Sequence, residues 1–323
     1  MKSGWIVTKD HKTFIEFRDM QVPQPKSQEV VIKVFASAMN RGEIFAGGAV
    51  HGGPEKQGGG EASGIVHAVG DGISGIQIGD EVFGRVRGGF SEYAVMDIHQ
   101  LMPKPKCLSW EQAAAVPVSY ITAYEAIVMY GHLQAGETLL VMGASSGAGM
   151  ASIHMAKELG AKSIGTSGSQ QKLDQLKTIG LDVGIATRQP DFAEAVRAAT
   201  GGHGVDLVVN GVGGSVFAEC VRCLAFRGRL ATVGYVDNQF SAEIDLNAVH
   251  VGRLEIFGVS NARLPVSGRA ESAAGFIRDM LPALQNGRMI PIVDKVFNFD
   301  QLAAAKAHME ASAMVGKIVV RIA

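Results

Sequence analysis

The feature that most constrains the fold of this chain is a regular alternation of apolar and helical segments between residues 138 and 259. Short apolar segments rich in Val, Ile and Leu are typical of buried strands, and here they recur with helical patterns between them. Such alternation builds βαβ units, so we predict an α/β fold with a doubly wound parallel sheet. The predicted strands are 138–142, 162–166, 183–186, 206–210, 229–233 and 254–259, and the predicted helices are 147–159, 170–179, 191–200 and 215–226.

The turn after the first of these strands has almost no large side chains. It reads VMGASSGAGMAS, with three glycines and two serines within seven residues, and it leads into a helical pattern. In a strand–turn–helix unit, free amides and the positive end of the helix dipole face a phosphate, and glycine lets the backbone approach it closely. We therefore expect a dinucleotide site here, with contacts from Ser145, Ser146, Gly147 and Ala148; a turn that serves only the packing of the sheet is the alternative.

The end of the second predicted strand indicates which dinucleotide binds. A site for NAD usually has Asp or Glu about 20 residues after the turn, where it binds the ribose 2′-hydroxyl. Here the segment reads SIGTSGSQQKLDQL, and its first acid, Asp174, lies inside the predicted helix. A 2′-phosphate needs hydroxyl donors and cations, which Ser167, Ser169, Lys172 and Arg188 would supply. We therefore predict NADPH as the cofactor. The alternative interpretation of Lys172 is a solvent-exposed helix residue that does not bind the cofactor.

The first 120 residues and the part after residue 264 have a different pattern. Short strand patterns are separated there by Gly- and Pro-rich turns, and GDGISGIQIGDEVFG alone contains five glycines. Tight turns between short strands are typical of antiparallel or barrel sheets. Two helical patterns follow residue 264. The strands expected in these parts are 29–35, 64–69, 89–96, 293–298 and 317–322.

Composition excludes several classes of function. The formal net charge is -1, from 30 basic and 31 acidic residues, so we expect no nucleic-acid-binding face. Three cysteines favour a reducing compartment without a disulfide framework. The N-terminus lacks the apolar core of a signal peptide, and the charge-free stretch 138–156 is too rich in Gly and Ser for a membrane span. We therefore expect a cytoplasmic protein that binds neither nucleic acid nor membrane.

Several segments, in the right order along the chain, resemble the medium-chain dehydrogenase/reductase superfamily, and within it the zinc-independent, zeta-crystallin-like quinone oxidoreductase group. The family's A-x-x-G-x-x-G turn is matched by Gly143, Ser146 and Gly149, with two departures from the pattern. The other similar segments are VVIKVFASAMNRGE (30–43), GGGEASGIVHAVGDGISGIQIGDEVFG (58–84), GGFSEYAVM (88–96), AAAVPVSYITAYEAI (113–127), GVDLVVNGVGG (204–214) and GKIVVRI (316–322).

The resemblance implies a domain organisation. A GroES-like β-barrel domain would comprise residues 1–120 and be completed by 264–323, with a Rossmann nucleotide-binding domain at 121–263 inserted between them. The active site would lie in the cleft. Family members commonly pair the last strands of their nucleotide domains across a dimer, which implies a homodimer through Leu254–Val259.

The resemblance also implies a reaction centre without metal. Zinc-dependent relatives bind the catalytic ion with Cys, His and a further Cys or acid, and the matching positions here are Asn40, Gly60 and Val118. None of these is a good zinc ligand. Glu61 matches a buried acid of the family, for which we expect a structural or supporting role. Cys220 and Cys223 lie in an apolar helical pattern without a second cysteine pair, so we expect them in the core.

Without a Lewis acid, substrates that delocalise the incoming charge are easier to reduce than an isolated ketone. We therefore expect hydride transfer from NADPH to quinones or other α,β-unsaturated carbonyls. The resemblance implies that Asn40 lines the cleft beside the nicotinamide and the substrate. It also implies cofactor contacts from Thr122, Asn210, Gly211, Val212, Gly234, Tyr235, Phe257 and Val259.

The proton donor is less well defined. Related quinone reductases have two tyrosines after this Asn, and the chain has Phe45 and His51 at those places. Because imidazole transfers protons near neutral pH, we predict His51 as a catalytic residue together with Asn40. A solvent-exposed His without a role fits the glycine-rich segment AVHGGPEKQGGG equally well. Arg41 either attracts an anionic substrate or reaches solvent.

Two other functions stay open. An enoyl-thioester reductase would need a cationic entrance for a long acyl carrier, and the sequence has no basic cluster around the expected cleft. A weakly catalytic nucleotide-binding protein with a structural or RNA-binding role is the third hypothesis. The nearly neutral charge argues against RNA.

Overall fold

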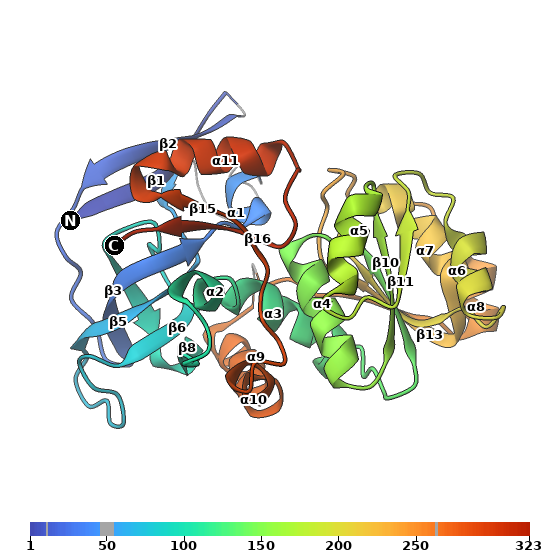
Figure 1. Cartoon of the computed structure of the whole chain (residues 1–323), viewed down its shortest axis with the longest axis horizontal. Coiled ribbons are helices and arrows are strands. Elements are labelled where there is room, and N and C mark those ends of the chain that lie inside the picture. Colours follow the sequence, from blue (N-terminus) through green and yellow to red (C-terminus); the bar gives the residue numbers. More distant parts are fainter. Residues whose placement is uncertain (11, 46–54, 262–263) are drawn as a thin grey trace. The chain divides into compact units, whose positions relative to one another are not determined.

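The chain forms two compact units (Figure 1). The terminal unit consists of Met1–Ile121 and Ala262–Ala323, and the central unit of Thr122–Asn261. The computed structural model describes residues 1–10, 12–45, 55–261 and 264–323.

The sheet of the central unit confirms the predicted doubly wound fold. Its six strands are all parallel and lie in the order β11-β10-β9-β12-β13-β14. The chain reverses its direction of progress across the sheet between β9 and β12, and ligands of such sheets bind at the carboxyl ends of these strands. The strands are β9 (Thr138–Met142), β10 (Lys162–Ser167), β11 (Val183–Ala186), β12 (Val205–Asn210), β13 (Leu224–Thr232) and β14 (Glu255–Gly258).

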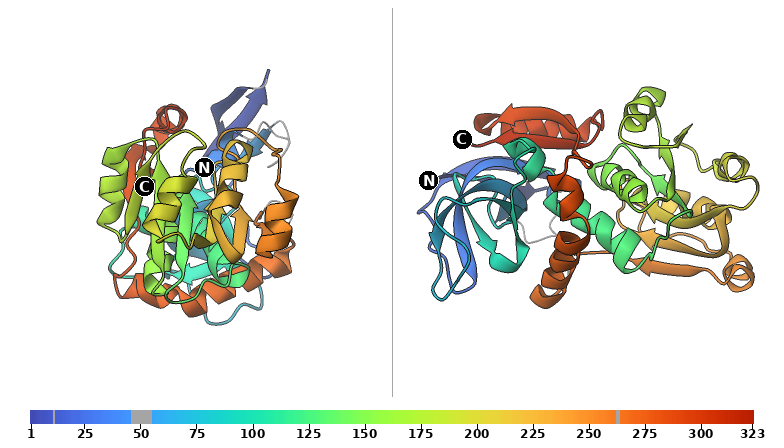
Figure 2. Two further views of the ribbon diagram at one scale, coloured as in Figure 1. Left: turned by 90° about the vertical axis from the view of Figure 1, so that its right-hand side faces the viewer. Right: turned by 60° about the horizontal axis from the view of Figure 1, so that its bottom comes forward.

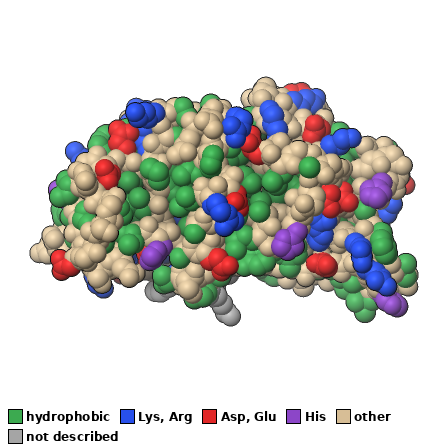
Figure 3. Space-filling model, turned by 90° about the horizontal axis from the view of Figure 1, so that it is seen from below, with side chains coloured by type: hydrophobic (Ala, Val, Ile, Leu, Met, Phe, Trp, Pro, Cys, Tyr) green, Lys and Arg blue, Asp and Glu red, His purple; other side chains and the backbone are tan. Residues whose placement is uncertain are grey.

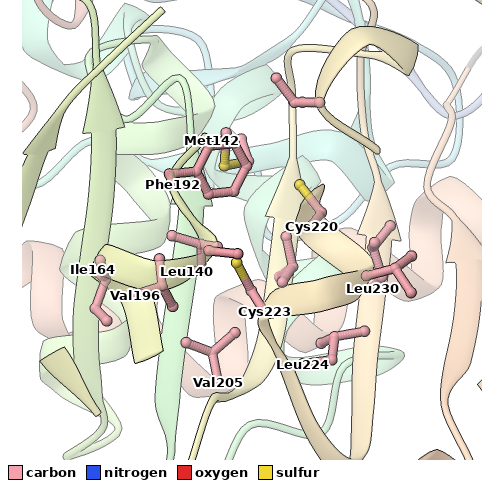
Figure 4. Close-up of a cluster of buried hydrophobic side chains, with 14 residues drawn as sticks. Leu140, Met142, Ile164, Phe192, Val196, Val205, Cys220, Cys223, Leu224 and Leu230 are labelled. Carbon is pink, nitrogen blue, oxygen red and sulfur yellow. The ribbon is translucent and has the colours of Figure 1, made fainter. Parts of the chain in front are cut away.

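Helices cover both faces of this sheet (Figures 1 and 2). Side chains from the sheet, such as Leu140 and Leu230, form a buried cluster with Val196, Cys220 and Cys223 from two of the helices (Figure 4). The expected core position of both cysteines is thereby confirmed, and burial raises the pKa of the Cys223 thiol to about 12. The helices of this unit are η2 (Glu125–Met129), α4 (Gly147–Glu158), α5 (Gln170–Lys177), α6 (Ala193–Ala199), η3 (Gly214–Val216), α7 (Phe217–Cys223) and α8 (Leu246–Gly252).

One predicted helix of this unit, 215–226, was wrong at its end. The helix stops at Cys223, and β13 begins at Leu224. Pairing with β12 jumps from Val205↔Leu224 to Leu207↔Arg229, so the extra residues bulge out of the ladder. Within this bulge Arg227 has φ +62°. The apolar period that suggested a longer helix therefore belongs partly to a bulged strand. Helix α8 was not predicted.

The terminal unit is built from two sheets. A seven-stranded sheet has the order β15-β16-β3-β5-β6-β8, with β7 paired to β3, and a three-stranded sheet has the order β2-β1-β4. The seven strands of the larger sheet are β3 (Glu29–Ala38), β5 (Glu61–Val69), β6 (Glu81–Arg85), β7 (Tyr93–Asp97), β8 (Leu101–Pro103), β15 (Val293–Asn298) and β16 (Lys317–Arg321). The strands of the smaller sheet are β1 (Lys2–Lys9), β2 (Lys12–Asp19) and β4 (Glu55–Gln57).

Strand β3 organises this unit because it pairs with three neighbours. Strand β5 pairs along nearly all of β3, from Val30 to Ser37, with irregular register at Val31/Ile32 and Val34/Ala36. Strand β7 pairs with the first half of β3, and β16 pairs with its end at 36–38. The helices of the unit are α1 (Arg41–Phe45), η1 (Ile98–Gln100), α2 (Trp110–Ala114), α9 (Val266–Asp279), α10 (Leu281–Gln285), η4 (Phe299–Gln301) and α11 (Leu302–Glu310), and α3 (Pro117–Tyr124) crosses the boundary at Ile121.

The charge-free stretch 138–156 forms β9 and most of α4. Across the described ranges, every helix falls short of the length and apolarity needed to cross a membrane. On the face of the molecule drawn in Figure 3, basic and acidic side chains are interspersed, as the balanced composition leads one to expect.

Candidate active site

The glycine-rich turn of the central unit connects β9 to α4. Gly143 has φ +68°, a left-handed conformation that glycine adopts without strain. Ser146 is the N-cap of α4, and its hydroxyl accepts a hydrogen bond from the Gly149 amide at 3.0 Å. A Cβ on Gly149 would lie 2.6 Å from the Ala144 carbonyl oxygen, so only glycine allows the helix to start this close to the turn.

This turn leaves backbone donors available. In the part of the chain that the structure describes, the amides of Ser145, Gly147 and Ala148 have no hydrogen-bond acceptor. They stand at the positive end of the dipole of a twelve-residue helix. Such a turn fits the pyrophosphate of a dinucleotide, because it offers several amides and only small side chains.

The carboxyl ends of neighbouring strands meet this turn. A Cβ on Gly143 would lie 3.5 Å from Val212 Cγ2, and a Cβ on Gly234 would lie 3.2 Å from the Gly211 carbonyl oxygen. Asn210 is buried, and both its side-chain nitrogen and its side-chain oxygen form hydrogen bonds within the chain. It donates to Gly213 O at 2.9 Å and accepts from the Val212 and Gly213 amides at 2.9 and 3.1 Å. Its side chain therefore shapes the turn that follows β12.

The remaining predicted cofactor contacts of the central unit lie on several elements. Thr122 is partly buried in α3, and Tyr235 is exposed beside Phe240 after β13. Phe257 lies in the edge strand β14, and the Val259 amide donates to Thr232 O at 2.9 Å. Their contact with a cofactor stays a prediction.

The loop after β10 gathers the residues expected at a 2′-phosphate. Ser167 ends β10, and Ser169 is the N-cap of α5, whose first turn contains Lys172. A Cβ built on Gly168 would overlap Arg188 Nε, so the guanidinium lies directly against the backbone between the two serines. The sequence has no acid between Ser167 and Lys172, and Asp174 pairs with Lys177 at 2.9 Å.

In the terminal unit, Asn40 belongs to a compact polar cluster that the sequence did not predict as a whole. Its Nδ2 donates to Glu61 Oε1 at 2.8 Å, and its Oδ1 accepts from Lys317 Nζ at 2.7 Å. Lys317 also pairs with Glu61 Oε1 at 2.7 Å, and Glu61 Oε2 accepts from the Val118 amide at 2.7 Å. The side chains of Glu61 and Lys317 are 0% and 4% exposed. Each charge is thus removed from water but fully paired, as a buried ion pair requires.

Lys317 was missed because the segment GKIVVRI reads as an apolar strand with a charged first residue. Its partners, Glu61 and Asn40, lie 256 and 277 residues away along the chain. Strand β16 pairs with β3, and β3 pairs with β5, which brings the three residues together. Within the described residues, no three His, Cys, Asp or Glu side chains gather as metal ligands would.

Arg41 and Glu43, which follow Asn40 in the sequence, form contacts within the terminal unit that the sequence did not predict. Arg41 donates to Met309 O at 3.1 Å and Ser312 Oγ at 2.9 Å, which ties α1 to the segment at the end of α11. Glu43 accepts the Gly59 amide at 2.6 Å through Oε1, while its buried Oε2 has no partner among the described residues. Burial raises the pKa of the Glu43 carboxyl to about 7. His51 lies outside the described residues.

Comparisons with known proteins agree with this architecture. A family profile described as "Alcohol dehydrogenase GroES-like domain" matches residues 26–106, and one described as "Zinc-binding dehydrogenase" matches residues 147–276. A crystal structure of an NAD-dependent alcohol dehydrogenase superimposes over the whole of both chains with a TM-score of 0.86 at 28% identity. The predicted fold, a Rossmann sheet inserted into a GroES-like domain, is thereby confirmed.

Curated relatives differ in length. Quinone oxidoreductase of Rattus norvegicus is 28% identical over 311 residues, which cover 93% of this chain and 91% of that protein. A phenolphthiocerol/phthiocerol polyketide synthase protein of Mycobacterium tuberculosis is 28% identical over 302 residues, which cover 93% of this chain but only 14% of that protein. The two family profiles match in order along the chain, and the chain has the same fold as the alcohol dehydrogenase, with a sheet of the nucleotide-binding type. The chain therefore belongs to the medium-chain dehydrogenase/reductase superfamily, a superfamily of oxidoreductases.

Proposed function

We propose that this protein is an NADPH-dependent oxidoreductase that reduces quinones or other α,β-unsaturated carbonyls without zinc. The observation that carries the proposal is the turn between β9 and α4, where the amides of Ser145, Gly147 and Ala148 are available to a pyrophosphate. The similarity to rat quinone oxidoreductase supports the substrate class, because it extends over nearly the full length of both chains.

The loop after β10 supports NADPH rather than NADH. Two hydroxyls, Ser167 and Ser169, flank the glycine on which Arg188 lies, and Lys172 adds a second cation. A 2′-phosphate gains charge-assisted hydrogen bonds from such a set. A ribose 2′-hydroxyl would have no carboxylate to bind in this loop.

The residues around Asn40 support a reaction without zinc. A carboxamide at Asn40, a glycine at Gly60 and an isopropyl group at Val118 are not zinc ligands. The Lys317 ammonium, 2.7 Å from Asn40 Oδ1, would also repel a metal cation placed there. A conjugated substrate is the chemistry that fits, because it spreads the incoming charge over several atoms.

When bound, NADPH supplies the hydride that reduces the conjugated bond. The residues of the chain bind and orient the reactants. Asn40 offers an N–H donor toward the carbonyl oxygen, which gains negative charge during the reaction. His51 stays the predicted proton donor, with solvent water as the alternative.

Purified protein, NADPH and a substrate panel test this function. We expect NADPH oxidation with a benzoquinone and with an enal, and a lower kcat/KM with crotonyl-pantetheine. A higher kcat/KM for the thioester would favour the second candidate, an enoyl-thioester reductase, which the similarity to a segment of polyketide synthases supports. Failure of all three substrates would overturn the proposal.

We also propose that the protein forms a homodimer through its edge strand β14. Among the described residues, this strand pairs only with β13, at the end of the six-stranded sheet, and Ile256 on it is 38% exposed. An exposed apolar edge gains from a partner strand. Sedimentation velocity should show a dimer for the wild type and a monomer for Ile256→Lys; a monomeric wild type would contradict the proposal.

A further inference from the structure

The ion pair between Lys317 and Glu61 has one feature that packing alone does not explain: its two members form hydrogen bonds with the oxygen and the nitrogen of the Asn40 carboxamide. Lys317 Nζ donates to Asn40 Oδ1 at 2.7 Å, while Glu61 Oε1 accepts from Asn40 Nδ2 at 2.8 Å. Glu61 is itself fixed, because its second oxygen accepts the Val118 amide at 2.7 Å. Both charged side chains are almost fully buried, so neither can turn outward to another partner.

This arrangement selects one of the two orientations of the amide. If the carboxamide of Asn40 were flipped, its NH2 group would face the Lys317 ammonium and its oxygen would face the Glu61 carboxylate. Two attractive contacts would become two repulsive ones, in a site with little water to screen them. The ion pair therefore determines that Asn40 presents its nitrogen on the Glu61 side.

The selected orientation leaves one donor unused. The NH2 group has two hydrogens, and Glu61 takes one of them. Among the residues that the structure describes, no acceptor takes the other, and Asn40 is partly exposed although both charged partners are buried. An ammonium on Oδ1 also draws electron density from the amide, which makes the remaining N–H a stronger donor.

We propose that Lys317 is a positioning residue, whose ammonium fixes the Asn40 carboxamide so that its free N–H binds the carbonyl oxygen of the substrate. The inference rests on the proposed function and names the acceptor: a neutral carbonyl oxygen that becomes an enolate or phenolate oxygen. As hydride from NADPH bonds to the conjugated carbon, the π pair moves to this oxygen, and a proton from the predicted donor His51 or from solvent water completes the product. Asn40 keeps both of its hydrogens.

A double-mutant cycle tests the coupling between Lys317 and Asn40. We expect Asn40→Ala to lower kcat about 100-fold, as removal of one oxyanion donor does, and Lys317→Met to lower it about 10- to 100-fold. In the Asn40→Ala background, Lys317→Met should change kcat less than about 2-fold, because the group that it positions is gone. The control Lys306→Met, which removes the ion pair with Glu310 in α11, should leave kcat unchanged. The NADPH Kd should stay within about 2-fold of wild type in every variant. Effects of Asn40→Ala and Lys317→Met that multiply would overturn the proposal.

Two more variants protect the test against misfolding. Lys317→Met leaves a buried carboxylate without its cation, so the double variant Lys317→Met, Glu61→Gln removes both charges together and should show the same loss of kcat. Asn40→Asp keeps the acceptor for Lys317 but has no N–H, and we expect it to be as slow as Asn40→Ala. Asn40→Asp with nearly wild-type kcat would contradict a donor role.

An NMR measurement separates failure of this inference from failure of the proposed function. The side-chain 15N–1H2 signal of Asn40, assigned by its loss in Asn40→Asp, should be sharp in the wild type and shifted or broadened in Lys317→Met. This result is expected even if no substrate of the panel is reduced. An Asn40 signal unaffected by Lys317→Met would refute the positioning role.

Discussion

Arg188 offers the most direct control of cofactor choice, and its effect can be estimated from the structure. The guanidinium lies on Gly168, between Ser167 and Ser169. Replacement by Ala removes one charge-assisted contact with a 2′-phosphate, worth about 1.5–3 kcal/mol. Because Arg188 is exposed, solvent screening favours the lower half of this range, about 1.5–2 kcal/mol. We expect NADPH affinity to fall about 10- to 30-fold and NADH affinity to change little.

Fluorescence titration of NADPH and NADH against a set of variants checks this estimate. Arg188→Gln keeps most of the packing against Gly168 without the charge, and should behave like Arg188→Ala. Arg188→Lys should retain most of the preference, and Lys172→Ala should reduce it further. The preference should also weaken as salt is raised, since the contact is exposed. Equal wild-type affinities for the two cofactors, or equal losses of both in Arg188→Ala, would refute the reasoning.

The remaining predictions concern stability and metal dependence. Ser146→Ala removes the N-cap of α4 and should lower the free energy of unfolding by about 1 kcal/mol in urea titrations; an unchanged value would contradict a stabilising cap. Burial lowers the pKa of His154 to about 4, so the unfolded chain binds a proton at this residue more readily than the folded chain as pH falls from about 6.5 to 4. The free energy of unfolding of the wild type should therefore fall by at most about 3 kcal/mol over this range, and His154→Gln should not show this loss. The raised pKa of Glu43 has the opposite effect: its contribution to the free energy of unfolding is complete below pH about 4.5 and is lost as pH rises through about 7. In Glu43→Gln, the free energy of unfolding should depend less on pH between these values, and parallel pH curves for wild type and variant would contradict this. Turnover with a quinone should survive exhaustive chelation, and activity lost with EDTA and restored by zinc would be evidence for a metal site.

The parts of the fold that could be predicted are those whose signal is local. Strands β9 and β11 end at the predicted residues, because each is a short run without charged side chains between polar residues or glycine, although only β9 is buried. The turn from Gly143 to Gly149 was recognisable for the same reason, since its glycines and the N-cap serine are adjacent in sequence. Strand β2 has eight residues, but its exposed and half-buried residues include several charges, so its signal is weaker and it was not predicted.

The polar cluster around Asn40 could be predicted only in part, because its geometry depends on contacts between distant segments. Asn40 and Glu61 could be selected from the family resemblance, but their hydrogen bond follows from the pairing of β3 with β5. The sequence around Lys317 is that of an ordinary strand, and only the pairing of β16 with β3 brings this lysine to the cluster. No local pattern in a sequence reports that a lysine will be 4% exposed and paired with a carboxylate 256 residues away.

The measurement that most directly tests the central claim is isotope transfer by metal-free protein. NADPH with deuterium at both C4 positions of the nicotinamide is incubated with chelator-treated protein and an enal, and the product is analysed by mass spectrometry. We expect one deuterium on the β-carbon of the saturated aldehyde, formed at the same rate with and without added zinc. Product without deuterium, or deuterium transfer that appears only when zinc is returned, would contradict it.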